Sequence, residues 1–213
     1  MKKILYLIAS AALMLLAASC ADFLEPKDHG LVDRDFVFSS INNTRAAMKQ
    51  VYSQWQGVAD GDFYGNGNFY AVIARANTII SAMEDSDDFE SYMSASEPTE
   101  LSQLYGEAVV ARSTIYQMLI RYWGDVPFTN ESGVAATGIA PRDSIYDIVI
   151  ADLERVVPHM YRSGSVPGYG ADKNGFSRTF AEASLANICM DAAGYQTRRS
   201  DLTYKDGEGK EIS

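Results

Sequence analysis

Residues 97–128 read EPTELSQLYGEAVVARSTIYQMLIRYWGDVPF, and this stretch decides which kind of fold the chain can adopt. Apolar side chains recur in it every three or four residues, the spacing that brings them to one face of an α-helix. We therefore expect one long helix from about Glu97 to Trp123. The face expected to pack into the core consists of Leu101, Leu104, Ala108, Ala111, Ile115, Leu119 and Tyr122.

The two ends of this helix are marked by residues of suitable type. Ser96 can cap the N-terminus, and Pro98 is tolerated in the first turn because the N–H groups there lack helical partners. Gly124 is expected to end the helix, since glycine readily adopts the conformation that closes one. Pro127 follows and prevents the chain from returning to helix.

The same periodicity occurs on both sides of this stretch and predicts helices over 40–56 and 69–83, from about Asp143 to Pro158, and within 176–194. No comparable run of alternating residues predicts a sheet. We therefore expect an all-α fold of tetratricopeptide-like antiparallel helix pairs with long loops between them. The apolar stripes are Ala47, Met48, Val51, Tyr52 and Trp55 in the first helix, Phe69, Ile73, Ala76, Ile80 and Met83 in the second, Ile145, Ile148, Val149, Leu153 and Val156 in the third, and Leu185, Ala186, Ile188, Cys189 and Ala193 in the last.

Two details of the last predicted helix follow from residue type. Thr179 and Glu182 have the spacing of a capping box. Cys189 falls on the expected inner face, so we interpret it as a small core residue and not as a reactive thiolate.

Composition and charge narrow the possible functions. The chain has 213 residues, 47% hydrophobic and 22% charged, as in one globular domain. Acidic residues outnumber basic ones 28 to 18, which gives a formal net charge of −10. Nucleic acid and anionic lipid surfaces are disfavoured as partners, because both bind clustered basic side chains. With two cysteines and two histidines, we expect no zinc cluster and no disulfide framework.

The N-terminus predicts export and lipidation. Residues 1–20 read MKKILYLIASAALMLLAASC: two lysines, an apolar stretch shorter than a bilayer span, and small residues before a cysteine. This resembles the lipobox of bacterial lipoproteins, in which the cysteine receives diacylglycerol and becomes the mature N-terminus. We expect a signal peptide over 1–19, an acylated Cys20 as the only membrane anchor, and no other cofactor. The alternative is an ordinary cleaved signal in which Cys20 is incidental.

The remaining chain divides by composition. Residues 20–36 are expected to form an extended polar leader, and residues 37–195 the helical domain. Residues 196–213 are polar and have no apolar stripe, so they are either a tail or the start of a missing C-terminal part.

The loop at 57–68, GVADGDFYGNGN, is the best candidate for ligand binding. Aromatic faces stack on sugar rings, and short polar side chains bind their hydroxyl groups. The alternative is a plain turn between helices. A calcium loop is excluded, because its fifth and twelfth positions are Tyr64 and Ala71 and lack the required oxygen ligands. The candidate ligand-binding residues are Asp60, Asp62, Phe63, Tyr64, Asn66 and Asn68.

Trp123 is a second candidate for sugar binding, because its indole ring can stack on a sugar ring and Asp125 can accept hydrogen bonds from the sugar hydroxyl groups. We favour a structural interpretation, in which Tyr122 and Trp123 pack beneath the following loop and Asp125 binds backbone N–H groups in the turn. Hydrogen bonds or ion pairs between neighbouring helices likewise best explain Arg75, Asn77, Glu107 and Arg112.

An enzymatic function is not expected. His29 and His159 have no Ser or Cys nucleophile at a recognisable spacing. Carboxylates are abundant, but without a cleft they do not indicate a glycosidase, so a hydrolase is only a third hypothesis.

Four segments in order resemble the SusD/RagB family of surface lipoproteins. Residues 70–80 resemble its Y-x-x-I-x-R-A-N motif, and 106–128 its G-E-A-x-x-x-R-A-x-x-Y stretch, which continues into R-Y-x-G-D-V-P-L. Residues 141–153 are similar to P-R-x-S-x-x-E-V-Y-x-x-I-x-x-D-L, and 176–194 to the family's Ala-rich helix. The family-motif positions, to which we assign structural roles, are Arg75, Asn77, Glu107, Arg112, Trp123, Gly124, Asp125, Pro127, Arg142 and Asp152.

This resemblance implies a helical protein that is lipid-anchored in the outer membrane and exposed at the cell surface. It implies capture of a nutrient, most simply a glycan oligomer, for a SusC-like TonB-dependent transporter, without catalysis. Family members are usually longer, and their loop between the first two helices is larger. The alternative is therefore a truncated helical-repeat scaffold that docks on a partner without binding ligand.

Overall fold

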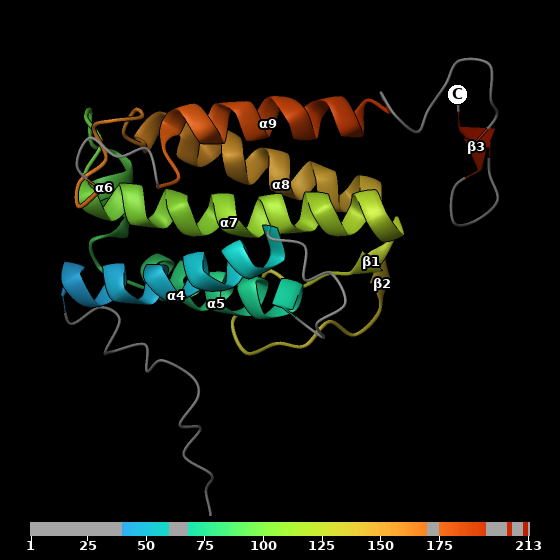
Figure 1. The fold of residues 1–213 in the computed structure, drawn as a ribbon, viewed down its shortest axis with the longest axis horizontal. Coiled ribbons are helices and arrows are strands. Elements are labelled where there is room, and N and C mark those ends of the chain that lie inside the picture. The colour runs from blue at the N-terminus through green and yellow to red at the C-terminus, as the bar shows by residue number, and fades with distance from the viewer. Residues whose placement is uncertain (1–39, 60–67, 170–174, 195–203, 206–210, 213) are drawn as a thin grey trace, which may run out of the picture. The chain divides into compact units, whose positions relative to one another are not determined.

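The computed structural model describes residues 40–59, 68–169, 175–194, 204–205 and 211–212. Figure 1 shows α4, α7 and α9 running in one direction, and α5 and α8 in the other. The predicted all-α fold of antiparallel helix pairs is confirmed. The helices of this part of the chain are α4 (Ile41–Ala59), α5 (Asn68–Glu84), α6 (Phe89–Met93), α7 (Glu100–Trp123), α8 (Arg142–Val156), the 3₁₀ helix η2 (Val157–His159) and α9 (Arg178–Ala192).

Short antiparallel strand pairs add to the helices. β1 (Val126–Pro127) pairs with β2 (Ile139–Ala140), within the region expected to be a loop. β3 (Tyr204–Lys205) pairs with β4 (Glu211–Ile212), within the region expected to be a polar tail. Strands of two residues have no alternating pattern to detect, so the periodicity of the sequence could not reveal them.

α7 is the central helix and contacts α4, α5, α8 and α9. Every residue from Ser102 to Gln117 is buried. This part of α7 is therefore buried on all sides, and not only along the single core face that periodicity predicted. Tyr122, placed on that face by periodicity, is 60% exposed, which makes its assignment to the core wrong. Periodicity reports the direction of a side chain, but burial depends on whether another element lies in that direction.

Glycine in the N-terminal part of α7 permits a close approach. A Cβ atom on Gly106 would lie 2.7 Å from Cγ of Met160, a buried residue that follows η2. The missing side chain therefore lets the segment after η2 pack directly on the central helix.

The start of α7 differs from the expectation. The helix begins at Glu100, and its cap is Thr99 instead of Ser96. Thr99 Oγ1 accepts a hydrogen bond from the backbone N–H of Ser102, and Ser102 Oγ accepts one from the N–H of Thr99. This reciprocal pair satisfies two backbone donors at once, and Pro98 lies before the cap.

The start and the inner face of α9 also differ from the expectation. Ser177, not Thr179, is the N-cap, because its Oγ accepts from the N–H of Phe180. Cys189 is exposed, so its interpretation as a core residue was wrong. Ala186 and Ala193 are exposed as well, and the buried residues of the helix are Ala181, Ser184 and Ile188. Small side chains occur all around α9, so its composition does not distinguish one face from another.

The other predicted stripes agree better with the structure. All five stripe residues of α5 are buried, as are Met48 and Val51 of α4. α8 ends at Val156 and continues as η2, which contains Pro158, as expected for a helix stopped by proline. Within the described residues, no helix has both the length and the apolar character needed to cross a membrane.

Candidate functional site

Most of the predicted ligand-binding residues cannot be placed. Asp60, Asp62, Phe63, Tyr64 and Asn66 lie outside the described residues, as do Cys20 and His29. Asn68 is the first residue of α5. The described residues nearest to this loop are the C-terminal part of α4 and the start of α5.

Arg112 joins several elements inside the bundle. Its Nη2 pairs with Asp152 Oδ2 of α8 at 2.7 Å, and its Nη1 donates to Asn77 Oδ1 of α5 at 2.9 Å. Asn77 Nδ2 in turn donates to the carbonyl oxygens of Thr129 at 3.1 Å and Glu131 at 3.4 Å. Three family-motif residues thus bind α5, α7, α8 and the segment after β1 together. With the guanidinium paired inside the fold, this cluster has a structural role.

Glu107 lies about one and a half turns before Arg112 on the same helix. It is fully buried, with an exposed fraction of 0%. Gln103 Nε2 donates to its Oε1 at 2.9 Å, and the Tyr169 hydroxyl donates to its Oε2 at 3.3 Å. Burial raises the pKa of the Glu107 carboxyl to about 7, although hydrogen bonds from Gln103, Tyr52 and Tyr169 oppose this shift. Glu107 does not pair with Arg112.

Residues around Glu107 also attach the segment between η2 and α9 to the bundle. Gln103 Oε1 accepts from the N–H of Tyr161 at 2.8 Å, and Gln103 Nε2 also donates to the carbonyl of Phe176 at 2.7 Å. The Tyr52 hydroxyl accepts from the N–H of Phe176 at 2.7 Å. Gln103 was not predicted as a buried polar partner, although its i,i+4 spacing to Glu107 was a usable signal.

Arg75 has a simpler role at the surface of the bundle. Its Nη1 donates to the side-chain oxygen of Gln50, which links α5 to α4. It does not pair with Asn77, which binds Arg112 instead.

The C-terminal end of α7 presents exposed aromatic rings, and Figure 1 shows β1 and β2 beside this end. Tyr122 is 60% exposed and Trp123 56% exposed. The interpretation that both rings pack beneath the following loop is therefore wrong. Trp123 instead meets Phe69 of α5 edge to face, with ring centroids 5.7 Å apart. Gly124 ends the helix with a φ of +74°, as glycine permits.

The turn after Trp123 is held by polar contacts. Asp125 Oδ1 accepts from the backbone N–H of Arg142, the first residue of α8, at 2.9 Å. The Tyr70 hydroxyl of α5 donates to the carbonyl of Pro127 at 3.0 Å. Asp125 thus satisfies a backbone N–H of α8, and the β1 end of the segment from β1 to β2 is fastened to both α8 and α5.

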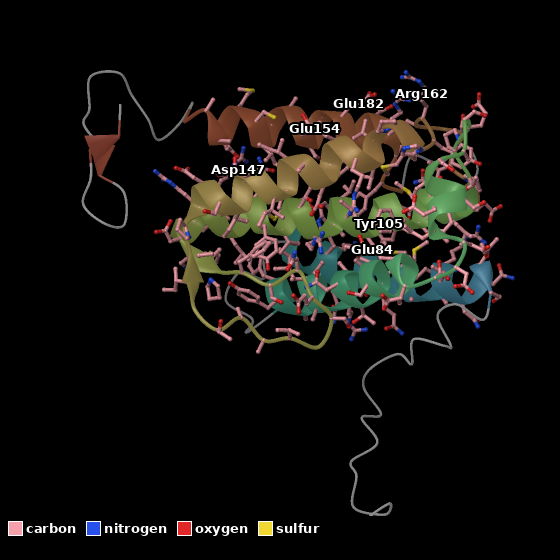
Figure 2. The ribbon with its side chains drawn as sticks, turned by 180° about the vertical axis from the view of Figure 1, so that it is seen from behind. Glu84, Tyr105, Asp147, Glu154, Arg162 and Glu182 are labelled. Carbon is pink, nitrogen blue, oxygen red and sulfur yellow. The ribbon has the colours of Figure 1, made fainter. Side chains whose placement is uncertain are left out.

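Glu84 is a carboxylate that joins helices. Tyr105 of α7 donates to Glu84 Oε1 of α5 at 2.6 Å, and the two side chains lie next to each other in Figure 2. Arg155 Nη2 of α8 pairs with the same oxygen at 3.0 Å. Among the described residues, no three His, Cys, Asp or Glu side chains gather in a way that could hold a metal ion. This includes the acidic turn at 84–88.

Comparisons with known proteins identify the same family that the sequence motifs resemble. A family model of SusD-like proteins, described as starch-binding and associating with the outer membrane, matches residues 11–157. Among solved structures, the chain resembles a SusD-like protein of Bacteroides fragilis, with 15% identity, a TM-score of 0.55, and coverage of 78% of this chain and 37% of that one. A SusD superfamily protein of Bacteroides thetaiotaomicron gives 19% identity, a TM-score of 0.54, and coverage of 73% and 45%. No curated protein matches the sequence.

At these identities the structural likenesses show the fold, and this chain spans less than half the length of either structure. The family model covers more than half of the chain. The ordered motifs, the antiparallel helix pairs and the matching family model together show that this chain belongs to the SusD-like family.

Proposed function

We propose that this protein is a surface-anchored, non-catalytic lipoprotein that binds a glycan oligomer and works with an outer-membrane TonB-dependent transporter. The observation that supports this best is the family match over residues 11–157, because the family is described as starch-binding and associating with the outer membrane. The anchor is the acylated Cys20, and the transporter partnership follows from the family resemblance.

The geometry of the described residues supports binding over catalysis. Glu107, Asp152 and Glu84 hold helices or loops together through hydrogen bonds and ion pairs. Carboxylates engaged in this way serve the scaffold. The aromatic and short polar side chains at 60–68 provide stacking faces and hydrogen-bonding groups, the pairing that carbohydrate recognition uses.

Isothermal titration against a panel of oligosaccharides tests the binding function. We expect the wild-type chain to bind at least one neutral oligomer without cleaving it, and Tyr64→Ala to weaken binding about tenfold through the loss of a stacking face. If Tyr64→Ala and the wild type bind with equal affinity, the loop is not part of the binding site. Turnover of any oligomer would contradict the non-catalytic role.

A matched control is available on the opposite end of the bundle. Ser102, near the start of α7, donates to the carbonyl of His159, whereas Phe69, next to the loop, contacts Trp123 at the end of α7. These two ends are about 30 Å apart, because each helical residue adds about 1.5 Å. Tyr161→Ala, close to the first end, should therefore leave glycan affinity unchanged.

The anchor has a test of its own. Radiolabelled palmitate should be incorporated into the wild-type precursor expressed in a Gram-negative host and not into Cys20→Ala. Incorporation that persists in Cys20→Ala, or that fails in the wild type, would contradict lipidation at this cysteine. Co-purification of the wild type, but not of Cys20→Ala, with outer membranes would support the proposed localisation.

A further inference from the structure

We propose that Tyr122 and Trp123 form a stacking platform for two successive sugar rings of a neutral pyranose oligosaccharide. This inference rests on the proposed glycan-binding function and names a subsite of it that does not depend on the loop at 60–67. The carrying observation is the exposure of two adjacent aromatic rings at the end of a helix whose middle is fully buried.

The exposure of these rings is unusual within the described residues. The large hydrophobic side chains exposed there are Ile41, Tyr122, Trp123, Val134, Ile139, Phe180 and Met190. Tyr122 and Trp123 are the one pair of neighbouring aromatic residues in this set. Aromatic rings bury a large apolar area when covered, so a ligand that covers these two rings together gains free energy from their burial.

The indole ring is held in place and more than half of its side chain is exposed. Trp123 and Phe69 meet at an interplanar angle of 86°, edge to face, and Phe69 is itself only 7% exposed. The Tyr122 ring also contacts the indole edge to face, and 56% of Trp123 is exposed to solvent beside these two neighbours. Because the ring already rests on a buried neighbour, little conformational entropy is lost when a ligand stacks on it.

The backbone on both sides of the rings is fastened too. Arg121 Nε pairs with Asp191 Oδ2 of α9 at 2.7 Å, and Asp125 binds the start of α8. The platform therefore lies where three helices meet, on a scaffold that does not need to rearrange on binding.

The arrangement of the rings allows contact with two sugar residues. The centroids of Tyr122 and Trp123 are 5.6 Å apart and the ring planes are inclined by 61°, so the two rings contact each other edge to face. Because the planes are inclined, the exposed parts of the two rings face different directions, and each can meet the C–H face of a different sugar residue. A disaccharide unit is the smallest ligand that uses both rings.

The charges nearby favour a neutral ligand over an acidic glycan. Arg121 is paired with Asp191, and Arg142 has Asp143 within 3.9 Å. The chain as a whole has a formal net charge of −10, which repels polyanions. The patch is also small, with a charged residue before it and Gly124 and Asp125 after it, which suits a sugar better than the broad apolar centre of a protein interface.

The test uses calorimetry and the fluorescence of tryptophan. The chain has two tryptophans, and Trp55 is half-buried with its Nε1 bonded to Thr114. A neutral oligosaccharide should therefore change the emission of Trp123.

Trp123→Ala should weaken binding about tenfold and abolish the emission change, whereas Trp123→Phe, which keeps a ring, should retain part of the affinity. Tyr122→Ala should reduce the preference for a disaccharide over a monosaccharide. Met190→Ala, which removes an exposed apolar side chain from α9, is the control and should bind like the wild type.

The outcomes separate this inference from the proposed function. If the wild type binds an oligosaccharide and Trp123→Ala, folded by circular dichroism, binds it equally well, the platform is overturned and the glycan-binding function stands. If the wild type binds no neutral oligosaccharide, the proposed function is contradicted, and the platform with it. Tighter binding of an oligogalacturonate than of any neutral oligomer would overturn the assignment of a neutral ligand.

Discussion

Glu107 and Arg112 lie close together on α7, but the bundle accommodates their charges in different ways. Arg112 meets the carboxylate of Asp152, while Glu107 accepts hydrogen bonds from the neutral groups of Gln103 and Tyr169. A buried carboxylate with neutral partners keeps a large desolvation cost, and burial accordingly raises the pKa of Glu107 to about 7.

This difference predicts how stability depends on pH. The pKa of Glu107 is higher in the folded state than its ordinary value of 4.5, so the folded state binds the proton more tightly. Its contribution to stability is fully present below about pH 4.5 and is lost as the pH rises through about 7. A pKa shift of this size corresponds to a free-energy difference of about 3 kcal/mol between the two protonation states.

Glu107→Gln removes the titrating group and keeps the shape of the side chain. We expect the variant to gain stability relative to wild type as the pH is raised from 5 to 8, by up to about 3 kcal/mol in urea unfolding. Glu154→Gln, at an exposed position of α8, should show no such pH-dependent gain. A Glu107→Gln difference that does not change with pH would show that this carboxyl does not titrate in that range.

At the scale of elements, the helix ends were the least predictable features. The caps expected from the sequence were Ser96 for α7 and Thr179 for α9. The structure selects Thr99 and Ser177, since their oxygens reach N–H groups of the first turn. Which hydroxyl becomes the cap depends on where the preceding chain enters the helix, and that is set by tertiary packing.

The choice of cap at α7 can be measured. Thr99→Ala should lower the free energy of unfolding by about 1 kcal/mol, because it leaves first-turn N–H groups without their partner. Ser96→Ala should change it by less than about 0.5 kcal/mol, since Ser96 lies outside the capping pair. Equal losses in the two variants, or a larger loss for Ser96→Ala, would contradict the observed capping box.

At the scale of the whole molecule, the bundle is organised around the polar cluster of Arg112 as much as around its apolar core. Arg112, Asn77 and Asp152 come from three helices that are far apart in sequence. Their structural roles could be predicted from the family resemblance, but their pairing could not. Pairing depends on the angle and register at which helices pack, which local periodicity does not encode.

Arg112→Met should therefore destabilise the whole bundle. We expect a loss of about 3–5 kcal/mol in urea unfolding, because Asp152 and Asn77 lose their buried partner. Faster amide hydrogen exchange should follow in α5 and α8 and in residues 129–131 together. Arg178→Met removes a more exposed ion pair, with Glu182 at 2.9 Å, and should cost at most about 1 kcal/mol. Similar losses in the two variants would mean that the Arg112 cluster does not hold the helices together.

The sequence by itself determined the helical class, the approximate extent of α4, α5, α7 and α8, and the ordered motifs of the family, because all of these are local patterns along one chain. The packing of the helices determines that residues 102–117 of α7 are buried on every side, that Cys189 faces solvent, and that Trp123 is exposed beside Phe69. The physical reason is that periodicity states in which direction a side chain points. Whether it meets solvent or another helix depends on elements brought together from distant parts of the chain.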